Sequence, residues 1–252
     1  MPHDYRSATG KVPEVTPGFW LIKIAATTLG ETGGDALSMS LGLGYLVSTA
    51  ILALVFAAAV GAQIGARRFH PLLYWLSIVA TTTVGTTLAD LADRSLGIGY
   101  AGGSVLLLAL LLASLVIWYR TLGSIAVDSV ASPRAEAFYW ITIMFSQTLG
   151  TALGDWTADS AGLGYTGAMM IFGGLLLVVA AAYFWTRLSR TALFWLAFVL
   201  TRPLGAVLGD FLDKPIGHGG LALSRAGASA VLVALMLVLI RLVPQRPASK
   251  LH

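Results

Sequence analysis

The chain has 252 residues, of which 57% are hydrophobic, only 11% are charged and none is cysteine, and its formal net charge is +4. Soluble domains carry charged residues at roughly 25%, so a mean hydropathy of +0.81 predicts a polytopic membrane protein. Without cysteine there is no disulfide, thiolate metal site or cysteine nucleophile. The first eighteen residues are polar, so no cleavable signal is expected.

Eight apolar stretches follow, each long enough to cross a hydrocarbon core of about 30 Å as a helix. They occupy residues 19–39, 44–66, 74–94, 100–120, 138–158, 164–186, 193–213 and 220–242. The expected fold is therefore an all-α integral membrane protein with eight transmembrane helices. Residues 19–242 would form a single transmembrane domain, with cytoplasmic tails at 1–18 and 243–252.

The eight stretches form four copies of one unit. Each copy opens with an aromatic residue and tryptophan, has glycine ten residues after the tryptophan and aspartate five residues later. The aspartates are Asp35, Asp90, Asp155 and Asp210. Units follow one another at spacings of 55, 65 and 55 residues, which indicates an internal quadruplication. The repeats are expected at residues 19–68, 74–123, 139–189 and 194–242.

Basic residues gather at one side of the four expected hairpins. They are Arg6, Lys11, Arg67, Arg68, Arg120, Arg134, Arg187, Arg190, Arg241, Arg246 and Lys250. The positive-inside rule then places both termini and the loops between repeats in the cytoplasm. All four hairpins would insert in one orientation, as parallel repeats with a pseudo-fourfold or pseudo-twofold arrangement. The positive charge thus indicates a lipid bilayer as partner and argues against nucleic acid.

Five further basic residues lie elsewhere in the expected topology. Arg94 and Lys214 fall at the opposite turns, whereas Lys23, Arg202 and Arg225 fall inside expected spans. A charge inside a span is costly and requires a partner or water. We therefore expect Arg202 to lie within reach of an acidic residue on a neighbouring helix.

Acidic residues concentrate on one face of the first helix of each repeat. Positions 27, 31, 35 and 38 fall within about 80° on a helical wheel. In the four repeats this stripe reads Thr27, Glu31, Asp35, Ser38; Thr82, Thr86, Asp90, Asp93; Gln147, Thr151, Asp155, Ala158; and Arg202, Ala206, Asp210, Asp213. Because polar side chains facing lipid are costly, the stripes should all face inward.

This pattern predicts a central acidic cavity that binds and passes cations. The expected site residues are Asp35, Asp90, Asp155 and Asp210 in one ring, Glu31, Thr86 and Thr151 one turn nearer the cytoplasm, and Gln147 and Arg202 deeper still. Oxygen ligands without Cys or paired His suit Mg²⁺, Mn²⁺ or Ca²⁺. The four aspartates and Glu31 are the candidate metal ligands, and Glu31 is expected to exchange a proton for the cation. The metal would be a substrate, with no resident cofactor and no catalytic residue.

Three other functions remain open from the sequence. The acids could pair with Arg94, Lys214, Arg202 and Arg225 in a structural or assembly protein that transports nothing. Arg202 could instead recognise an anion in an anion transporter. An intramembrane aspartyl enzyme is the third alternative, although neither of the Leu-Gly-Asp segments has the first glycine of a Gly-x-Gly-Asp motif. The ion, the direction of transport and the oligomeric state stay open, and an oligomer is compatible with the sequence.

Two segments carry a resemblance to known proteins. KIAATTLGETGGDALSMSLGLGY and TTTVGTTLADLADRSLGIGYAGGS resemble an uncharacterised family of bacterial repeat proteins described only as membrane-anchored. This resemblance covers all four repeats and implies a bacterial inner membrane location, but no activity. The run from Glu31 to Asp35 is more weakly similar to the Glu-x-Gly-Asp-Lys-Ser/Thr motif of cation exporters. It has an extra glycine before the aspartate, and Ala36 and Leu37 replace Lys-Ser/Thr.

Overall fold

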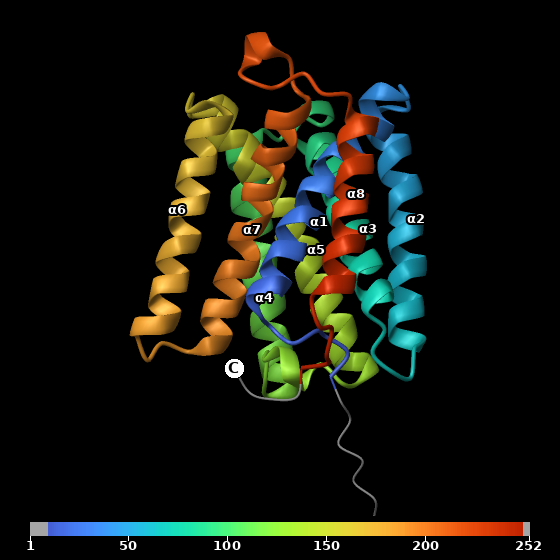
Figure 1. Cartoon of the computed structure of the whole chain (residues 1–252), viewed down its shortest axis with the longest axis vertical. Coiled ribbons are helices and arrows are strands. Elements are labelled where there is room, and N and C mark those ends of the chain that lie inside the picture. Colours follow the sequence, from blue (N-terminus) through green and yellow to red (C-terminus); the bar gives the residue numbers. More distant parts are fainter. Residues whose placement is uncertain (1–9, 249–252) are drawn as a thin grey trace, which may run out of the picture.

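A computed structural model describes residues 10–248 and contains eight α-helices within them (Figure 1). Their bounds are α1 Pro17–Asp35, α2 Gly44–Gly65, α3 Pro71–Asp90, α4 Tyr100–Leu122, α5 Pro133–Asp155, α6 Gly164–Trp185, α7 Arg190–Asp213 and α8 Arg225–Leu242. Local sequence explains several starts. Thr16 and Ser132 accept backbone N–H groups as N-caps, and proline follows each of them. The all-helical prediction is confirmed.

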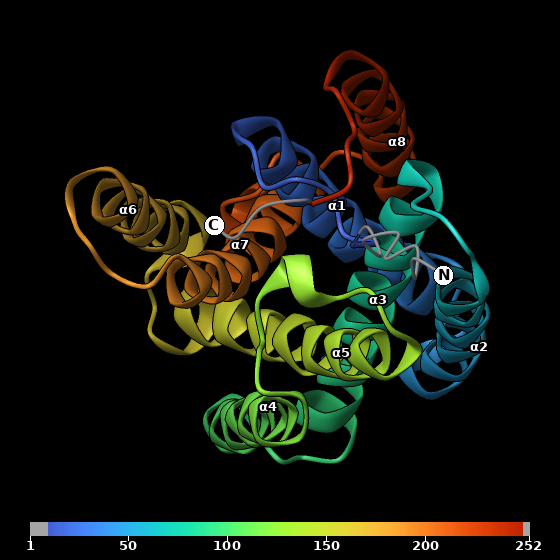
Figure 2. The ribbon, with the colours of Figure 1, turned by 90° about the horizontal axis from the view of Figure 1, so that it is seen from below.

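The first helices of the four repeats form a closed ring. Helix α1 contacts α3, α3 contacts α5, α5 contacts α7, and α7 returns to α1. The second helices pack outside this ring, as Figure 2 shows from one end. There α2 packs on α3, α4 on α5, α6 on α7 and α8 on α1. Each repeat therefore covers the ring helix of the next repeat, and the last repeat covers that of the first.

Aromatic residues close one end of the ring, which we call the aromatic end; the opposite end is the acidic end. In every interface the first aromatic residue of one repeat meets the tryptophan of the next. The ring-centroid distances are 5.4 Å for Phe19–Trp75, 5.8 Å for Tyr74–Trp140, 6.1 Å for Tyr139–Trp195 and 5.7 Å for Phe194–Trp20. Equivalent residues thus meet around the ring, so the repeats run parallel about a pseudo-fourfold axis.

Glycines let the ring helices approach closely at mid-length. A Cβ atom added at any of the four repeat glycines would touch the next helix. The facing pairs are Gly30 with Thr82, Gly85 with Gln147, Gly150 with Arg202, and Gly205 with Thr27. Small residues at helix crossings are typical of membrane helix packing. Here they bring the polar residues of neighbouring repeats together.

The sequence did not predict how three of the ring helices end. After their aspartates, α1, α3 and α5 continue into five-residue π-helical turns, at Ala36–Ser40, Leu91–Ser95 and Trp156–Ser160. A π-turn bonds residue i to i+5, so it rotates the following side chains away from α-helical phase. The fourth position of the expected stripe therefore leaves α-helical phase in the first three repeats, whereas Asp213 of the fourth repeat remains within α7. Ser38 donates to the carbonyl of Gly34, and the Asp93 carboxylate lies beside Gly103 of α4.

The last span begins later than expected. Helix α8 starts at Arg225, whereas residue 220 was the expected start. The preceding segment folds back on the end of α7, where Leu223 N–H donates to Leu212 O at 2.9 Å. Its proline and glycines cannot continue a helix. Arg225 consequently lies at the acidic end and not inside a span.

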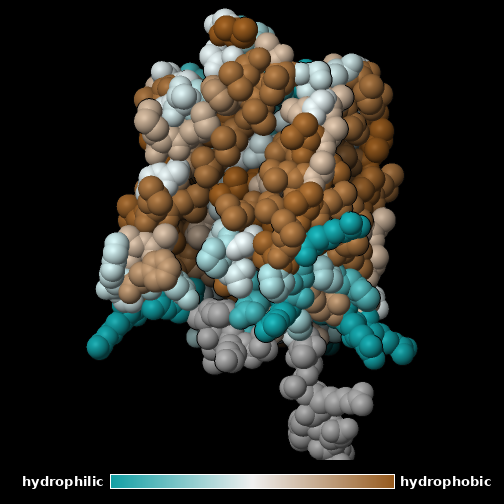
Figure 3. Space-filling model, in the orientation of Figure 1, coloured by the Kyte–Doolittle hydropathy of each residue, from teal (hydrophilic) through white to brown (hydrophobic). Residues whose placement is uncertain are grey.

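The outer surface is apolar over most of its height. Six helices in the described part of the chain are long and apolar enough to cross a membrane: α2, α3, α4, α6, α7 and α8. Helices α1 and α5 bury polar residues that include Glu31 and Gln147. Figure 3 shows hydrophobic side walls, with hydrophilic residues collected at the lower end. These features indicate a multi-pass membrane protein.

The chain ends near the aromatic end form a small cap. Glu14 N–H donates to Arg246 O, and Ala248 N–H donates to Val12 O, each at 2.8 Å. Lys11 Nζ lies 2.7 Å from the buried Glu136 carboxylate of α5. The outermost residues of the expected tails, with Arg6 and Lys250 among them, lie outside the described residues.

Candidate ion site

The four repeated aspartates lie together at the acidic end of the ring. Asp35, Asp90 and Asp155 are the last residues of α1, α3 and α5, and Asp210 lies in the last turn of α7. Their exposed fractions are only 1% to 4%. A carboxylate at a helix C-terminus is opposed by the helix dipole. Cations nearby are therefore needed to stabilise this ring.

Two basic residues bridge alternate interfaces of the aspartate ring. Arg94 Nε lies 2.8 Å from Asp90, and its Nη2 lies 3.3 Å from Asp155. Lys214 Nζ lies 2.5 Å from Asp35 and 3.0 Å from Asp210. Each base follows its own aspartate by four residues and reaches the aspartate on the neighbouring ring helix. The other two repeats have no base at this position, so the site has twofold character within the fourfold ring.

Asp213 and Arg225 form a further ion pair at the rim. Arg225 Nε lies 2.9 Å from Asp213 and 3.7 Å from Asp35. The pairing of acids with Arg94, Lys214, Arg202 and Arg225, which the sequence left open, is therefore present. Arg94 lies in the π-turn after α3 and Lys214 directly follows α7, at the turns where the sequence placed them.

Arg202 lies on the ring axis, one layer closer to the aromatic end. Its Nη2 is 2.9 Å from Glu31 Oε2 of α1, and it donates to Thr86 of α3 at 2.7 Å and to Thr151 of α5. One nitrogen of Arg202 thus contacts α1, α3 and α5. At the position equivalent to Glu31, Thr86 and Thr151, α7 has the apolar residue Ala206. Arg202 therefore supplies the polar group of α7 in this layer. The expected contact between Arg202 and an acid is present.

Deeper polar groups remain partly unsatisfied. Arg202 Nε and Nη1, both amide atoms of Gln147 and the Thr82 hydroxyl have no hydrogen-bond partner within residues 10–248. All three side chains are fully buried. Since buried polar groups are normally paired, this layer has unused hydrogen-bonding capacity next to Arg202.

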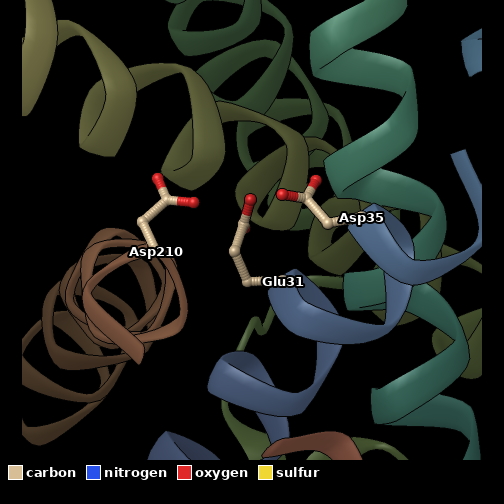
Figure 4. Close-up of side chains that lie close together, drawn as sticks. All are labelled: Glu31, Asp35 and Asp210. Carbon is tan, nitrogen blue, oxygen red and sulfur yellow. The ribbon is translucent and has the colours of Figure 1, made fainter. Parts of the chain in front are cut away.

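Three carboxylates converge closely enough to bind one cation. Oxygen atoms of Glu31, Asp35 and Asp210 all lie within 4.8 Å of one another. Figure 4 shows that Glu31 and Asp35 come from α1 and that Asp210 comes from α7, with all three side chains directed into one space. Carboxylate oxygens are the ligands that Mg²⁺, Mn²⁺ and Ca²⁺ prefer.

A cavity of about 350 Å³ reaches this cluster from the acidic end. Its lining residues are Arg94, Asp159, Tyr165, Asp210, Lys214, Pro215 and His218. His218, in the turn after α7, is thus part of the cavity wall. Asp210 and Lys214 connect the cavity to the ring.

The ring contains more acidic than basic groups. Its five carboxylates are Glu31, Asp35, Asp90, Asp155 and Asp210, and the bases that contact them from within it are Arg94, Arg202 and Lys214. Asp213 and Arg225 compensate each other at the rim. With all groups ionised, two negative charges remain, which equals the charge of one divalent cation.

The predicted site residues therefore lie in two adjacent layers. The aspartates form the ring, and Glu31, Thr86 and Thr151 meet Arg202 beneath it. Gln147 lies against Gly85, nearer the aromatic end. Their roles in ion binding stay predictions. The sequence suggested Arg94 and Lys214 only as structural partners of the acids, and their shared spacing of four residues from an aspartate was a usable signal for their place in the ring.

A known repeat family matches the chain at residues 18–69, 73–124, 138–189 and 193–243, under the description "Repeat of Unknown Function (DUF347)". The chain belongs to this family. The matched segments coincide with the four structural repeats, so each DUF347 copy is one ring helix and one outer helix. No curated protein and no solved structure matches the chain. The comparisons thus give no support to the similarity with cation exporters.

Proposed function

We propose that this DUF347 protein is a bacterial inner-membrane transporter that exports a hard divalent cation such as Mn²⁺, Mg²⁺ or Ca²⁺. The observation that carries the proposal is the convergence of Glu31, Asp35 and Asp210 within 4.8 Å beside a cavity at the acidic end. The excess of two carboxylates over bases in the ring supports a divalent ion. In this proposal the aromatic end faces the cytoplasm.

The layers along the axis support a path with one open and one closed end. The cavity reaches Asp210 from the acidic end, and the aromatic layer with its cap covers the other end. Arg202 separates the two, because its guanidinium contacts Glu31, Thr86 and Thr151 together. This arrangement corresponds to an outward-open state. Transport then requires the aromatic layer to separate and Arg202 to move.

Lys214 occupies the position in which a substrate cation would neutralise the same carboxylates. Its Nζ lies between Asp35 and Asp210, and its side chain is 14% exposed and lines the cavity. A lysine side chain has four rotatable methylenes and a compact point charge. We propose that the arriving cation displaces this ammonium, which returns when the cation leaves.

Binding of Mn²⁺, Mg²⁺ and Ca²⁺ to purified protein, measured by calorimetry, tests this site. Asp210→Asn should weaken binding at least tenfold, which equals about 1.4 kcal/mol. Lys214→Met should tighten binding, because the competing internal cation is removed. Asp128→Asn, in the loop before α5, is the matched control and should change nothing. Wild-type protein that binds none of the three ions would contradict the proposal.

A structural role is the second candidate, since Arg94 and Lys214 tie neighbouring repeats together through Asp90, Asp155, Asp35 and Asp210. In that case wild-type protein would bind no cation, and removing both bases would lower thermal stability without another effect. Anion transport has only the unpaired Nε and Nη1 of Arg202 in its favour, because Nη2 is already shared by Glu31 and two threonines.

A further inference from the structure

Lys23 is a buried basic residue with no role in the site described above. It lies on the stripe of α1 that continues through Thr27 and Glu31 to Asp35, at intervals of four residues. Its side chain is fully buried. At 1.5 Å per residue, it stands about 12 Å from Glu31 along the axis, between Arg202 and the aromatic layer.

The other three repeats have an apolar residue at the position of Lys23. The equivalent residues of the other repeats are Ile78, Ile143 and Phe198, and all are fully buried. Lys23 Nζ lies 4.1 Å from the centroid of the Phe198 ring and 3.4 Å from the hydroxyl of Thr201. Three repeats thus show that an apolar side chain fits this position, so packing does not require a lysine.

No carboxylate within residues 10–248 forms an ion pair with Lys23. Of the helices packed on α1, α3 carries the acid Asp90, and α7 carries Asp210 and Asp213. These acids lie at the acidic end and pair with other bases there, so none of them neutralises Lys23. A buried charge without a partner is strongly unfavourable, so this amine has an alternative state as a neutral base.

We propose that Lys23 is the proton-binding group of the transport cycle, so that a proton and the cation occupy the axis alternately. This inference rests on the proposed cation transport. When Arg202 moves and the cation leaves through the acidic end, Nζ takes a proton from water at that end. The resulting ammonium repels a cation at the acids. When the aromatic layer separates and the next cation binds, the amine returns its proton to water at the aromatic end.

Glu31, which the sequence suggested for this role, is engaged elsewhere. Its Oε2 pairs with Arg202 at 2.9 Å, and a proton there would leave the guanidinium without a carboxylate partner among residues 10–248. Lys23 has no such commitment. A unit charge about 12 Å from a divalent cation, at an effective dielectric constant of about 20, changes the affinity for that cation roughly a hundredfold. This effect is large enough to couple the two sites.

The test uses full-length protein in liposomes, with Mn²⁺ uptake and internal pH recorded by two dyes. Wild type should move protons against Mn²⁺. Lys23→Ile and Lys23→Met should retain Mn²⁺ uptake down its gradient, with proton movement reduced at least tenfold and uptake independent of pH. Ile78→Val, in the same layer, is the matched control and should behave as wild type.

The outcomes separate this inference from the proposed function. Proton-coupled uptake in both Lys23 variants would overturn the role of Lys23 and leave cation transport intact. Loss of Mn²⁺ uptake or a lower melting temperature in both variants would also overturn it, because Lys23 would then serve passage or packing. Wild-type protein without any Mn²⁺ uptake would refute cation transport, and the coupling role with it.

Discussion

Arg202 breaks the equivalence of the four repeats more than any other residue of the ring. Three repeats have Thr27, Thr82 and Gln147 at its position, and only Arg202 reaches across the axis. Its one carboxylate partner is Glu31, and both side chains are buried. Removing one member of a buried ion pair costs about 3–5 kcal/mol, because the other charge is left uncompensated.

Arg202→Ala should therefore lower the free energy of unfolding by about 3–5 kcal/mol, and the double variant with Glu31→Gln should recover most of that loss. Reversible unfolding in mixed micelles would measure both. The single variant should also bind Mn²⁺ more tightly and release it more slowly, since a fixed positive charge is gone. Equal destabilisation by the single and double variants would show that the two residues are not energetically coupled.

The effect on transport of replacing an aspartate should depend on whether that aspartate lies in the ring. Asp90→Asn or Asp155→Asn removes an acid that contacts Arg94 in the ring, so transport should fall to background while folded protein remains in the membrane. Asp128→Asn removes an acid in the loop before α5 and should have little effect. Metal content of cells expressing each variant, compared at equal protein levels, measures the difference. Normal transport by the ring variants would refute this prediction.

At the scale of elements, the close crossings between ring helices depend on glycine. A Cβ added to Gly209 of α7 would lie 2.6 Å from Glu31 Cβ, whereas one added to Gly173 of α6 would meet nothing within 4 Å. Gly209→Ala should thus force α7 away from α1. Gly173→Ala should be neutral or slightly stabilising, because alanine favours a helix by up to about 1 kcal/mol over glycine.

Both variants replace glycine by alanine, so a comparison of their melting temperatures tests the effect of position alone. We expect a lower melting temperature for Gly209→Ala alone. The same shift in both variants would show that the crossing of α1 and α7 tolerates a methyl group, and that the model of close packing there is wrong.

Sequence periodicity predicted where the helices lie, but it did not predict the direction of every side chain on them. The repeated tryptophan, glycine and aspartate predicted four equivalent helices, because identical spacing on a helix gives identical faces. Two features depend on contacts between distant segments. The π-turns rotate Asp93 and Ser38 away from the axis, and each outer helix packs on the next repeat instead of its own. Lys23 was overlooked as a single basic residue, although alignment with Ile78 and Ile143 marks it as exceptional.

At the scale of the whole molecule, the ring requires all four hairpins to insert in one orientation. Single cysteines at Ser132, beside the aromatic end, and at Ile98, in an acidic-end turn, test the direction. Ser132 should react only with reagents that reach the cytoplasm, and Ile98 only with external ones. The cysteine-free chain makes the background negligible. A third position, Ser249, lies outside the described residues. Labelling of Ser132 from outside would invert the proposed orientation.

The most direct test of the account is Mn²⁺ flux into liposomes that contain the purified protein, measured with an internal fluorescent indicator. We predict saturable uptake that competes with Mg²⁺ or Ca²⁺ and falls to the level of empty liposomes in Asp210→Asn. The acids would then be a site on a conducting path. Uptake by wild type no faster than by empty liposomes, for all three ions and in both gradient directions, would contradict the account and leave the ion pairs as structural ties.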